Sequence, residues 1–224
     1  MSIAYFITGT DTNVGKTLVA CALLHKFAQA GQRVAGMKPV AAGVDADGNN
    51  EDVVLLRAAS NITAAPELTN PYLLRSAISP HLAARQNDVF IDIEYITLCL
   101  AQLRAQADCV IVEGAGGFRV PLNDTQDSAD LALALALPVI MVVGLRLGCL
   151  NHALLTQEAI AARGLRLAGW VANQIDPHMH AVEDNVATLS ARIAAPMLGM
   201  VPFQTRPDAM RVTALLTLPD PRPR

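Results

Sequence analysis

Short apolar runs alternate with amphipathic segments along most of the chain. Buried strands are predicted by the apolar runs at residues 4–8, 33–40, 108–113, 137–144, 165–174 and 195–203. Helical spacing of apolar residues occurs between them, at residues 16–31, 51–60, 92–107, 129–137, 149–164 and 183–194. Residues 61–92 contain Pro66, Pro71 and Pro80 and follow neither period, so we expect an irregular connection there.

This alternation predicts a single α/β domain with a doubly wound, mostly parallel sheet and helices on both faces. Strands separated by helices need crossover connections, and such connections make neighbouring strands parallel. We place the domain at residues 1–205. Residues 206–224 form a C-terminal extension that we expect to be partly helical and then a flexible, proline-rich tail, "LPDPRPR".

The composition fits a buried parallel sheet. Of the 224 residues, 52% are hydrophobic but only 4% are aromatic, so the core must consist mainly of aliphatic side chains. The formal net charge is −3, and no run of like charge occurs. We therefore expect no nucleic acid and no anionic lipid surface as a partner.

A long apolar run at residues 129–148 is divided by Asp130, Pro138 and Gly144. We interpret it as a helix followed by a strand, because a membrane span needs about 20 largely apolar residues. The beginning of the sequence lacks the basic and apolar regions of a signal peptide. No pair forms a CxxC motif among the cysteines, so we expect a reduced, cytoplasmic protein; they are Cys21, Cys99, Cys109 and Cys149.

The segment Gly9–Thr17, "GTDTNVGKT", lies between a predicted strand and a predicted helix. Its glycines would let backbone N–H groups point at an anion at the start of the helix. Lys16 would reach the outer phosphates, and the Thr17 hydroxyl would bind Mg²⁺. The usual phosphate loop has four residues before Gly-Lys-Thr, whereas residues 10–14 give five here. The flanking strand and helix favour a nucleotide site over an accidental turn.

Three charged residues are further candidates. Glu113 ends a predicted strand, where it could lie near a bound Mg²⁺ or be a solvated acid. Asp52 opens a predicted helix and is a metal ligand or, more commonly, a helix-capping acid. Lys38 follows a strand and could stabilise a transferring phosphoryl group or lie on the surface. Gly114 and Gly116 would let the backbone approach phosphate or substrate closely.

Two asparagines also follow predicted strands. Asn173 could contact an adenine edge through its amide or simply cap a turn. Asn151 could cap the next helix, whose N-terminal N–H groups could bind a carboxylate. Because ligands of open α/β sheets bind beyond the carboxyl ends of the strands, these motifs are expected to lie at one edge of the sheet.

Taken in order, five segments resemble the dethiobiotin synthetase family: "GTDTNVGKT", "GMKPVAAG", "VEGAGG", "LPVIMVVGLRLGCLNHALLT" and "GWVAN". The resemblance covers most of the chain and is weaker over residues 44–107. It implies a phosphate-loop NTPase fold and an ATP- and Mg²⁺-dependent ligase of biotin biosynthesis. Such an enzyme closes a ureido ring on 7,8-diaminopelargonate with CO₂, through a carbamate and a carbamic–phosphoric anhydride, and releases dethiobiotin.

The resemblance also implies roles for individual residues. Catalysis would involve Lys38, Lys16 and Thr12. Mg²⁺ would be held by Thr17, Asp52 and Glu113. ATP would be bound by Asn13, Val14, Gly15, Lys16, Thr17, Leu18, Asp52, Glu113, Gly114, Ala115, Gly116, Asn173, Gln174, Pro202, Phe203 and Gln204. The diamine would be bound by Lys38 and Ala42 and, from the partner subunit of a homodimer, by Gly148, Cys149, Leu150 and Asn151.

Two positions depart from the family's pattern. Position 13 is Asn, where some members have an acid and others a small residue, and position 42 is Ala, where many members have Ser. Ala42 has no hydroxyl, which leaves open a paralogue with altered or lost ligase activity. A second alternative is an ATPase switch of the partitioning or division-site class, although these proteins carry a lysine where this chain has Asp11. A third, an amidotransferase on the same fold, would need room for a glutaminase domain.

Overall fold

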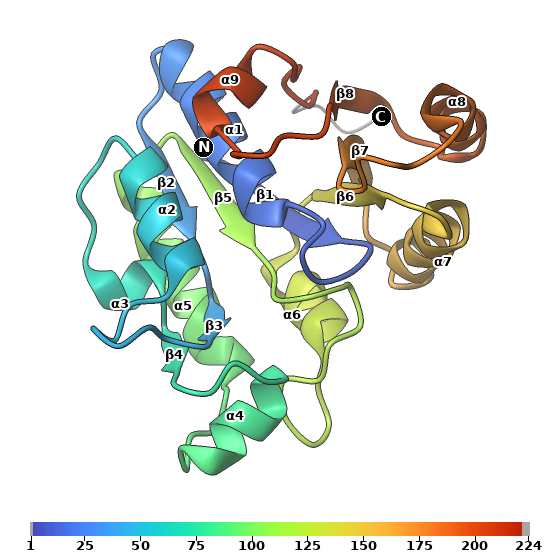
Figure 1. Cartoon of the computed structure of the whole chain (residues 1–224). Helices are drawn as coiled ribbons and strands as arrows, with labels where there is room; N and C mark the ends of the chain where they lie inside the picture. The colour runs from blue at the N-terminus through green and yellow to red at the C-terminus, as the bar shows by residue number, and fades with distance from the viewer. Residues whose placement is uncertain (1, 221–224) are drawn as a thin grey trace.

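A six-stranded sheet forms the centre of the molecule (Figure 1). The computed structural model describes residues 2–220. Its strands lie in the order β2-β5-β1-β6-β7-β8, and each adjacent pair is parallel. They comprise β1 (Ile3–Gly9), β2 (Val34–Met37), β5 (Cys109–Glu113), β6 (Val139–Leu145), β7 (Leu167–Gln174) and β8 (Met197–Val201). The predicted parallel sheet is confirmed.

Helices cover both faces of this sheet. One face is covered by α1 (Lys16–Gln29), α2 (Glu51–Ala59) and α9 (Ala209–Thr213). The other is covered by α5 (Ile93–Gln106), α6 (Ser128–Leu135), α7 (Cys149–Ala162) and α8 (Val182–Arg192). Within β1, Tyr5 and Ile7 pack toward α1 while Phe6 packs in the opposite core. Burial on both faces explains why the strands are apolar at nearly every position.

The strand predicted at residues 33–40 is broken in two. β2 ends at Met37, and Val40–Ala42 form β3, which pairs with β4 (Tyr72–Leu74) in a separate two-stranded parallel sheet. Pro39 has no N–H to continue the ladder. The N–H of Lys38 donates to the carbonyl of Thr69 (2.8 Å) instead of to a strand of the main sheet.

The expectation of an irregular connection at residues 61–92 is wrong in part. This segment contains α3 (Pro66–Thr69), β4 and α4 (Pro80–Gln86). Both helices begin at a proline, whose fixed φ suits the first helical position. The prolines that indicated a break in structure therefore start short helices.

The C-terminal extension folds back onto the main domain. It contains α9, and α9 lies against α1, where the Thr213 hydroxyl donates to the carbonyl of Ala22 (3.2 Å). Pro219 is buried, and its carbonyl accepts a hydrogen bond from the Tyr5 hydroxyl (3.4 Å), so the first residues of the expected flexible tail are ordered. The rest of that tail, residues 221–224, lies outside the described residues. The domain boundary at residue 205 stays a prediction.

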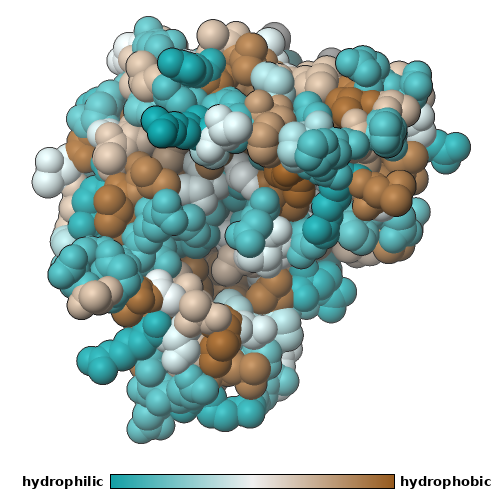
Figure 2. Space-filling model, in the orientation of Figure 1, coloured by the Kyte–Doolittle hydropathy of each residue, from teal (hydrophilic) through white to brown (hydrophobic). Residues whose placement is uncertain are grey.

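Polar and apolar residues are mixed over the surface. Figure 2 shows hydrophilic residues over much of one face, with hydrophobic residues in small separate groups. Among residues 2–220, no helix has the length and apolar character required to cross a membrane.

Candidate active site

The phosphate loop connects β1 to α1, and its backbone is left-handed at two positions. Asn13 and Gly15 both have positive φ, 59° and 90°. The Asn173 amide, at the end of β7, donates to the carbonyl of Val14 (2.8 Å). A Cβ atom at Gly15 would lie 2.1 Å from that amide nitrogen, so only glycine fits. The sequence suggests that the Asn173 amide contacts adenine or caps a turn. In the structure its Nδ2 atom instead supports the phosphate loop.

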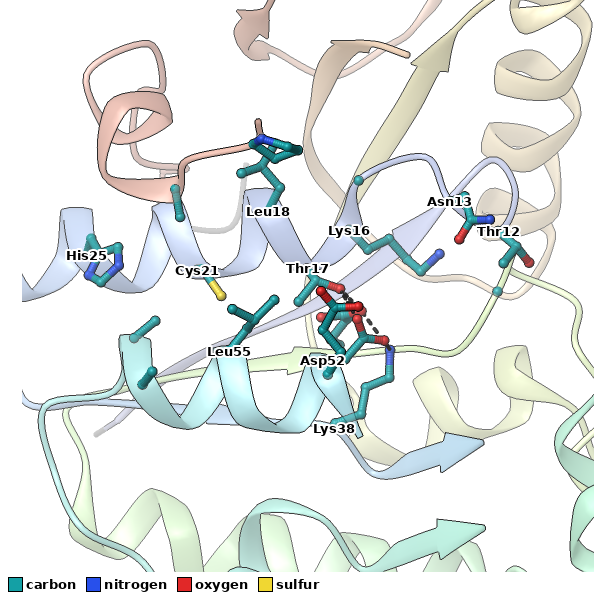
Figure 3. A pocket seen from close by; sticks show the side chains of 18 residues that line it. Thr12, Asn13, Lys16, Thr17, Leu18, Cys21, His25, Lys38, Asp52 and Leu55 are labelled. Atoms are coloured by element: carbon teal, nitrogen blue, oxygen red, sulfur yellow. Dashed lines mark hydrogen bonds and ion pairs between the residues drawn. The ribbon is translucent and has the colours of Figure 1, made fainter. Parts of the chain in front are cut away.

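Four side chains converge at the carboxyl ends of β2 and β5 (Figure 3). The Lys38 ammonium lies 2.7 Å from Asp52 Oδ2 and 2.6 Å from Glu113 Oε1. The Thr17 hydroxyl lies 2.7 Å from Asp52 Oδ1 and 3.0 Å from Glu113 Oε1, and its single proton can be donated to either. The starts of α1 and α2, the end of β5 and the connection after β2 thus form one charged cluster, as the strand-end argument predicted.

Burial controls the electrostatics of this cluster. The Glu113 side chain is fully buried, and burial raises the pKa of its carboxyl despite the neighbouring Lys38. Burial also disfavours charge on Lys38, but Glu113 and Asp52 outweigh it, so the pKa of Lys38 lies above its ordinary value. Asp52 is more exposed, and the attraction of Lys38 outweighs burial, lowering the pKa of that carboxyl. The three groups therefore form one charged cluster in which Lys38 and Glu113 are buried and Asp52 is partly exposed.

Lys16 is a second buried cation beside the cluster. Its ammonium donates to the carbonyl of Asp11 (3.0 Å) within the loop. Burial first, and repulsion by Lys38 second, lower its pKa to about 8. In Figure 3 the Lys16 and Lys38 side chains extend toward the same space at the N-terminal start of α1. An incoming polyphosphate would relieve the repulsion between them.

The donor set fits Mg²⁺. Glu113 Oε2 is buried and has no hydrogen-bond partner among the described residues, while Thr17 and Asp52 present further oxygens beside it. Mg²⁺ prefers oxygen ligands and is commonly held by one or two carboxylates, with water and phosphate completing the shell. Within residues 2–220 no cluster of three His, Cys, Asp or Glu residues that could hold a metal occurs, and the site offers two carboxylates and a hydroxyl.

Two cavities meet at the charged cluster. One, of about 540 Å³, runs along α1 and is lined by Lys16, Thr17 and Glu113. The second, of about 460 Å³, extends past the small sheet and is lined by Ala42 and Ala115. The walls of both cavities include Thr12, Asn13, Lys38, Asp52 and Gly116. The structure therefore joins most residues predicted for phosphate, metal and diamine around one space.

A third cavity, of about 260 Å³, adjoins the loop on the β7 side. Its walls include Gly15 and Leu18 and five further residues predicted to bind ATP: Asn173, Gln174, Pro202, Phe203 and Gln204. Val14 and Gly114 line none of the three cavities. Their carbonyl groups instead accept hydrogen bonds from Asn173 and Lys38, so these two residues support the site through the backbone.

Several cavity residues were not predicted from the sequence. Ser79 and Pro80, at the start of α4, line the second cavity beside Ala42. Their Ser-Pro pair is a helix-start signal, but it lies in the segment interpreted as irregular. His25 and Pro207 line the first cavity, and neither carries a recognisable sequence signal.

The turn at residues 148–151, which was predicted to bind the diamine, lies apart from these cavities within one chain. Gly148 has a φ of 95° and precedes Cys149, the first residue of α7. Cys149 is buried, and none of Gly148, Cys149, Leu150 and Asn151 lines the three cavities. The prediction assigned this turn to the partner subunit's site, so it stays a prediction.

Comparison with known proteins places this geometry in a family. A family model described as "AAA domain" matches residues 4–211. The chain is 55% identical to the ATP-dependent dethiobiotin synthetase of Aromatoleum aromaticum, over 96% of this chain and 97% of that one. The chain belongs to the dethiobiotin synthetase family. The Ralstonia nicotianae member is 58% identical, over 91% of this chain and 90% of that protein.

The dethiobiotin synthetase fold extends to more distant ATPases. The septum site-determining protein MinD from Pyrococcus horikoshii, solved with Mg-ADP, has a TM-score of 0.59, with 13% identity, over 90% of this chain and 82% of that chain. At that identity the likeness shows the fold alone. It is the fold that the resemblance implied, so the phosphate-loop NTPase architecture is confirmed.

Proposed function

We propose that this protein forms dethiobiotin from 7,8-diaminopelargonate, CO₂ and ATP. The observation that carries the proposal is the position of Lys38, buried between Asp52 and Glu113 where the phosphate cavity meets the Ala42 cavity. Membership of the dethiobiotin synthetase family supports the same substrates. A reaction that joins a phosphoryl group to a small acid needs such a junction.

The chemistry requires activation of a weak electrophile. One amine of the diamine adds to CO₂ and loses a proton, giving a carbamate. A carbamate oxygen then attacks the γ-phosphorus of ATP, forming a carbamic–phosphoric anhydride and ADP. The second amine attacks the carbamoyl carbon and loses a proton as phosphate leaves. Positioning and charge stabilisation suffice, and no protein nucleophile is needed.

Each cation of the site has a role in these steps. Lys38, at the junction, would bind the carbamate and stabilise charge on the transferred phosphoryl group. Lys16 would bind the outer phosphates on the α1 side. Thr12 lines both cavities and would contact the reacting groups between them. We assign the third cavity, beside Asn173 and Phe203, to adenine.

We infer that Thr17, Asp52 and Glu113 hold Mg²⁺. When bound, Mg²⁺ neutralises phosphate charge and orients the phosphate chain. The unpartnered Glu113 Oε2 supports this assignment, since a buried carboxylate oxygen without a donor is costly unless a cation satisfies it. Asp52 and Thr17 also bind each other, which keeps both oxygens beside Glu113.

We further infer a homodimer in which the partner's Gly148–Asn151 turn binds the diamine carboxylate. A helix N-terminus offers backbone N–H groups and a favourable dipole to an anion, and α7 begins within this turn, at Cys149. A cytoplasmic location fits the cysteines, because all four are free.

A direct assay tests the proposed function. Phosphate release from ATP is measured with bicarbonate and Mg²⁺, with and without 7,8-diaminopelargonate, and the product is identified by mass spectrometry. We expect release that depends on the diamine and a ureido product of matching amount. Diamine-independent release without that product would instead favour the switch-ATPase alternative.

Ala42 keeps a second candidate function open. It lines the diamine cavity without a hydroxyl, so a paralogue with an altered substrate remains an alternative. In the same assay, a fully coupled reaction with 7,8-diaminopelargonate excludes it, whereas the absence of product, together with binding of the diamine measured by calorimetry, supports it.

A further inference from the structure

An ion pair connects the phosphate loop to the turn that precedes α7. Arg146 Nη2 lies 2.5 Å from Asp11 Oδ2, and about half of each side chain is exposed. The two residues are 135 positions apart in the sequence. None of the roles proposed above uses either residue.

Asp11 holds the phosphate loop at three points. Its Oδ1 accepts from the N–H of Thr12 (2.7 Å), its carbonyl accepts from the Lys16 ammonium (3.0 Å), and its Oδ2 receives Arg146. The side chain thus fixes the start of the loop, and the carbonyl fixes the position of Lys16. A rotation of the Asp11 side chain would release the Thr12 N–H, and a shift of the Asp11 backbone would move Lys16.

Arg146 lies in the turn between β6 and α7. It directly follows β6, and its carbonyl accepts from the N–H of Cys149 (3.0 Å), closing the turn into α7. Gly148 gives that turn a positive φ of 95°. Nearby, β1 and β6 are linked by a backbone bond from Thr10 to Val142 (3.0 Å). The Arg146 side chain is the additional, charged contact between the two loops.

We propose that Arg146 is a positioning residue that couples nucleotide binding to diamine binding. It acts through Asp11 on Thr12 and Lys16 and through its own backbone on the Gly148–Asn151 turn. This inference rests on the proposed function. Since that turn would serve the partner's site, the pair links the phosphate loop of one subunit to the substrate site of the other.

A purely structural role for Arg146 would appear as a loss of thermal stability, whereas a positioning role would appear as a change in the coupling between two ligands. Ion pairs between half-exposed side chains contribute little to global stability, so removing Arg146 should leave the thermal midpoint nearly unchanged. Coupling between two ligands is instead a reciprocal ratio of affinities that a positioning residue can change on its own.

The experiment measures the affinity for 7,8-diaminopelargonate by calorimetry, with and without a non-hydrolysable ATP analogue and Mg²⁺. The ratio of the two dissociation constants is the coupling factor. We expect Arg146→Met to reduce this factor about fivefold or more. Arg146→Lys should restore part of it, because the charge is kept while the planar fork is lost.

A matched control and a double variant complete the test. Arg33→Met removes a comparably exposed ion pair, with Asp108, before the first residues of β2 and β5, and should leave the coupling factor unchanged. Asp11→Asn combined with Arg146→Met should lower the factor no further than either change alone.

Two results would overturn the inference: a wild-type coupling factor in Arg146→Met, or independent, multiplying effects of the two changes. In either case the wild-type protein would still make dethiobiotin, so the proposed function would survive. A wild-type protein that neither binds the diamine nor forms the product would overturn both.

Discussion

Lys38 is buried and charged because the chain turns away from the main sheet at this residue. Pro39 ends the ladder of the main sheet, and the Lys38 side chain then enters the buried space between Asp52 and Glu113. A buried cation with two carboxylate partners stays charged at neutral pH, consistent with its raised pKa. At the scale of single residues, the site therefore depends on charge held in place before any ligand arrives.

We expect Lys38→Gln to reduce dethiobiotin formation by about 10²-fold or more, since a preorganised charge at the reacting group is lost. The matched control is Lys26→Gln, because Lys26 binds the carbonyl of Thr213 away from the cavities. Turnover is measured alongside circular dichroism. Full turnover by a folded Lys38→Gln protein would remove Lys38 from the mechanism.

Gly15→Ala should abolish binding of an ATP analogue, because the new Cβ would overlap the Asn173 amide, 2.1 Å away. Gly31→Ala is the control: Gly31 also has a positive φ, 82°, but nothing lies within 4 Å of a Cβ there. Calorimetric titration distinguishes the two. Equal affinities in both variants would mean that the loop tolerates the overlap.

At the scale of elements, the C-terminal extension completes the core on the α1 face. Leu216 is 2% exposed in that core and bridges to Gly199 in β8, whereas its neighbour Leu215 is 43% exposed. Residues 209–219 are thus part of the folded unit rather than an appendage.

Leu216→Ala should lower the free energy of unfolding by about 2–5 kcal/mol, the usual cost of emptying a buried leucine site. Leu215→Ala should change it by less than about 0.5 kcal/mol. Urea denaturation measures both. Similar small losses in the two variants would show that the extension adds nothing to the core in solution.

At the scale of the whole molecule, an ion pair outside the site shapes acid stability. Arg33 and its backbone N–H both bind Asp108 and lower the pKa of that carboxyl from 3.8 to about 2. A depressed carboxyl pKa stabilises the fold fully above pH 3.8 and progressively less as the pH falls toward 2. The gap in urea-unfolding stability between wild type and Asp108→Asn should therefore shrink over that interval; a gap independent of pH would contradict it.

The homodimer can be tested by mixing two inactive variants. If Asn151 serves the partner's site, a hybrid of Lys38→Gln and Asn151→Ala subunits contains one intact site of its two. Random mixing should then restore about one quarter of wild-type activity. Mixing Lys38→Gln with Gly15→Ala is the control and should restore none, because both residues serve the same site. No recovery in the first mixture would place Asn151 in its own subunit's site or in none.

Much of the sheet and of the charged cluster could be predicted because the sequence shows where the apolar strands end. Lys38 and Glu113 follow apolar strands, and topology alone brings them together. The break at Pro39 and the helices at Pro66 and Pro80 could not be predicted, since proline indicates both breaks and helix starts. The contact of Arg146 with Asp11 carries no local signal, because it joins residues 135 positions apart.

The break at Pro39 also divides the site into two parts that can change independently in evolution. In the proposed assignment, ATP binds at the loops of the main sheet, whereas the small β3–β4 sheet and the start of α4 contribute Ala42, Ser79 and Pro80 to the other cavity. Substitutions in that small sheet can alter the shape of the cavity proposed for the diamine without disturbing the strands that precede the proposed phosphate site. Evolution or directed mutagenesis could thus adapt the protein to a different small acid through substitutions in β3, β4 and α4. The loops of the main sheet, which we assign to ATP, would stay unchanged.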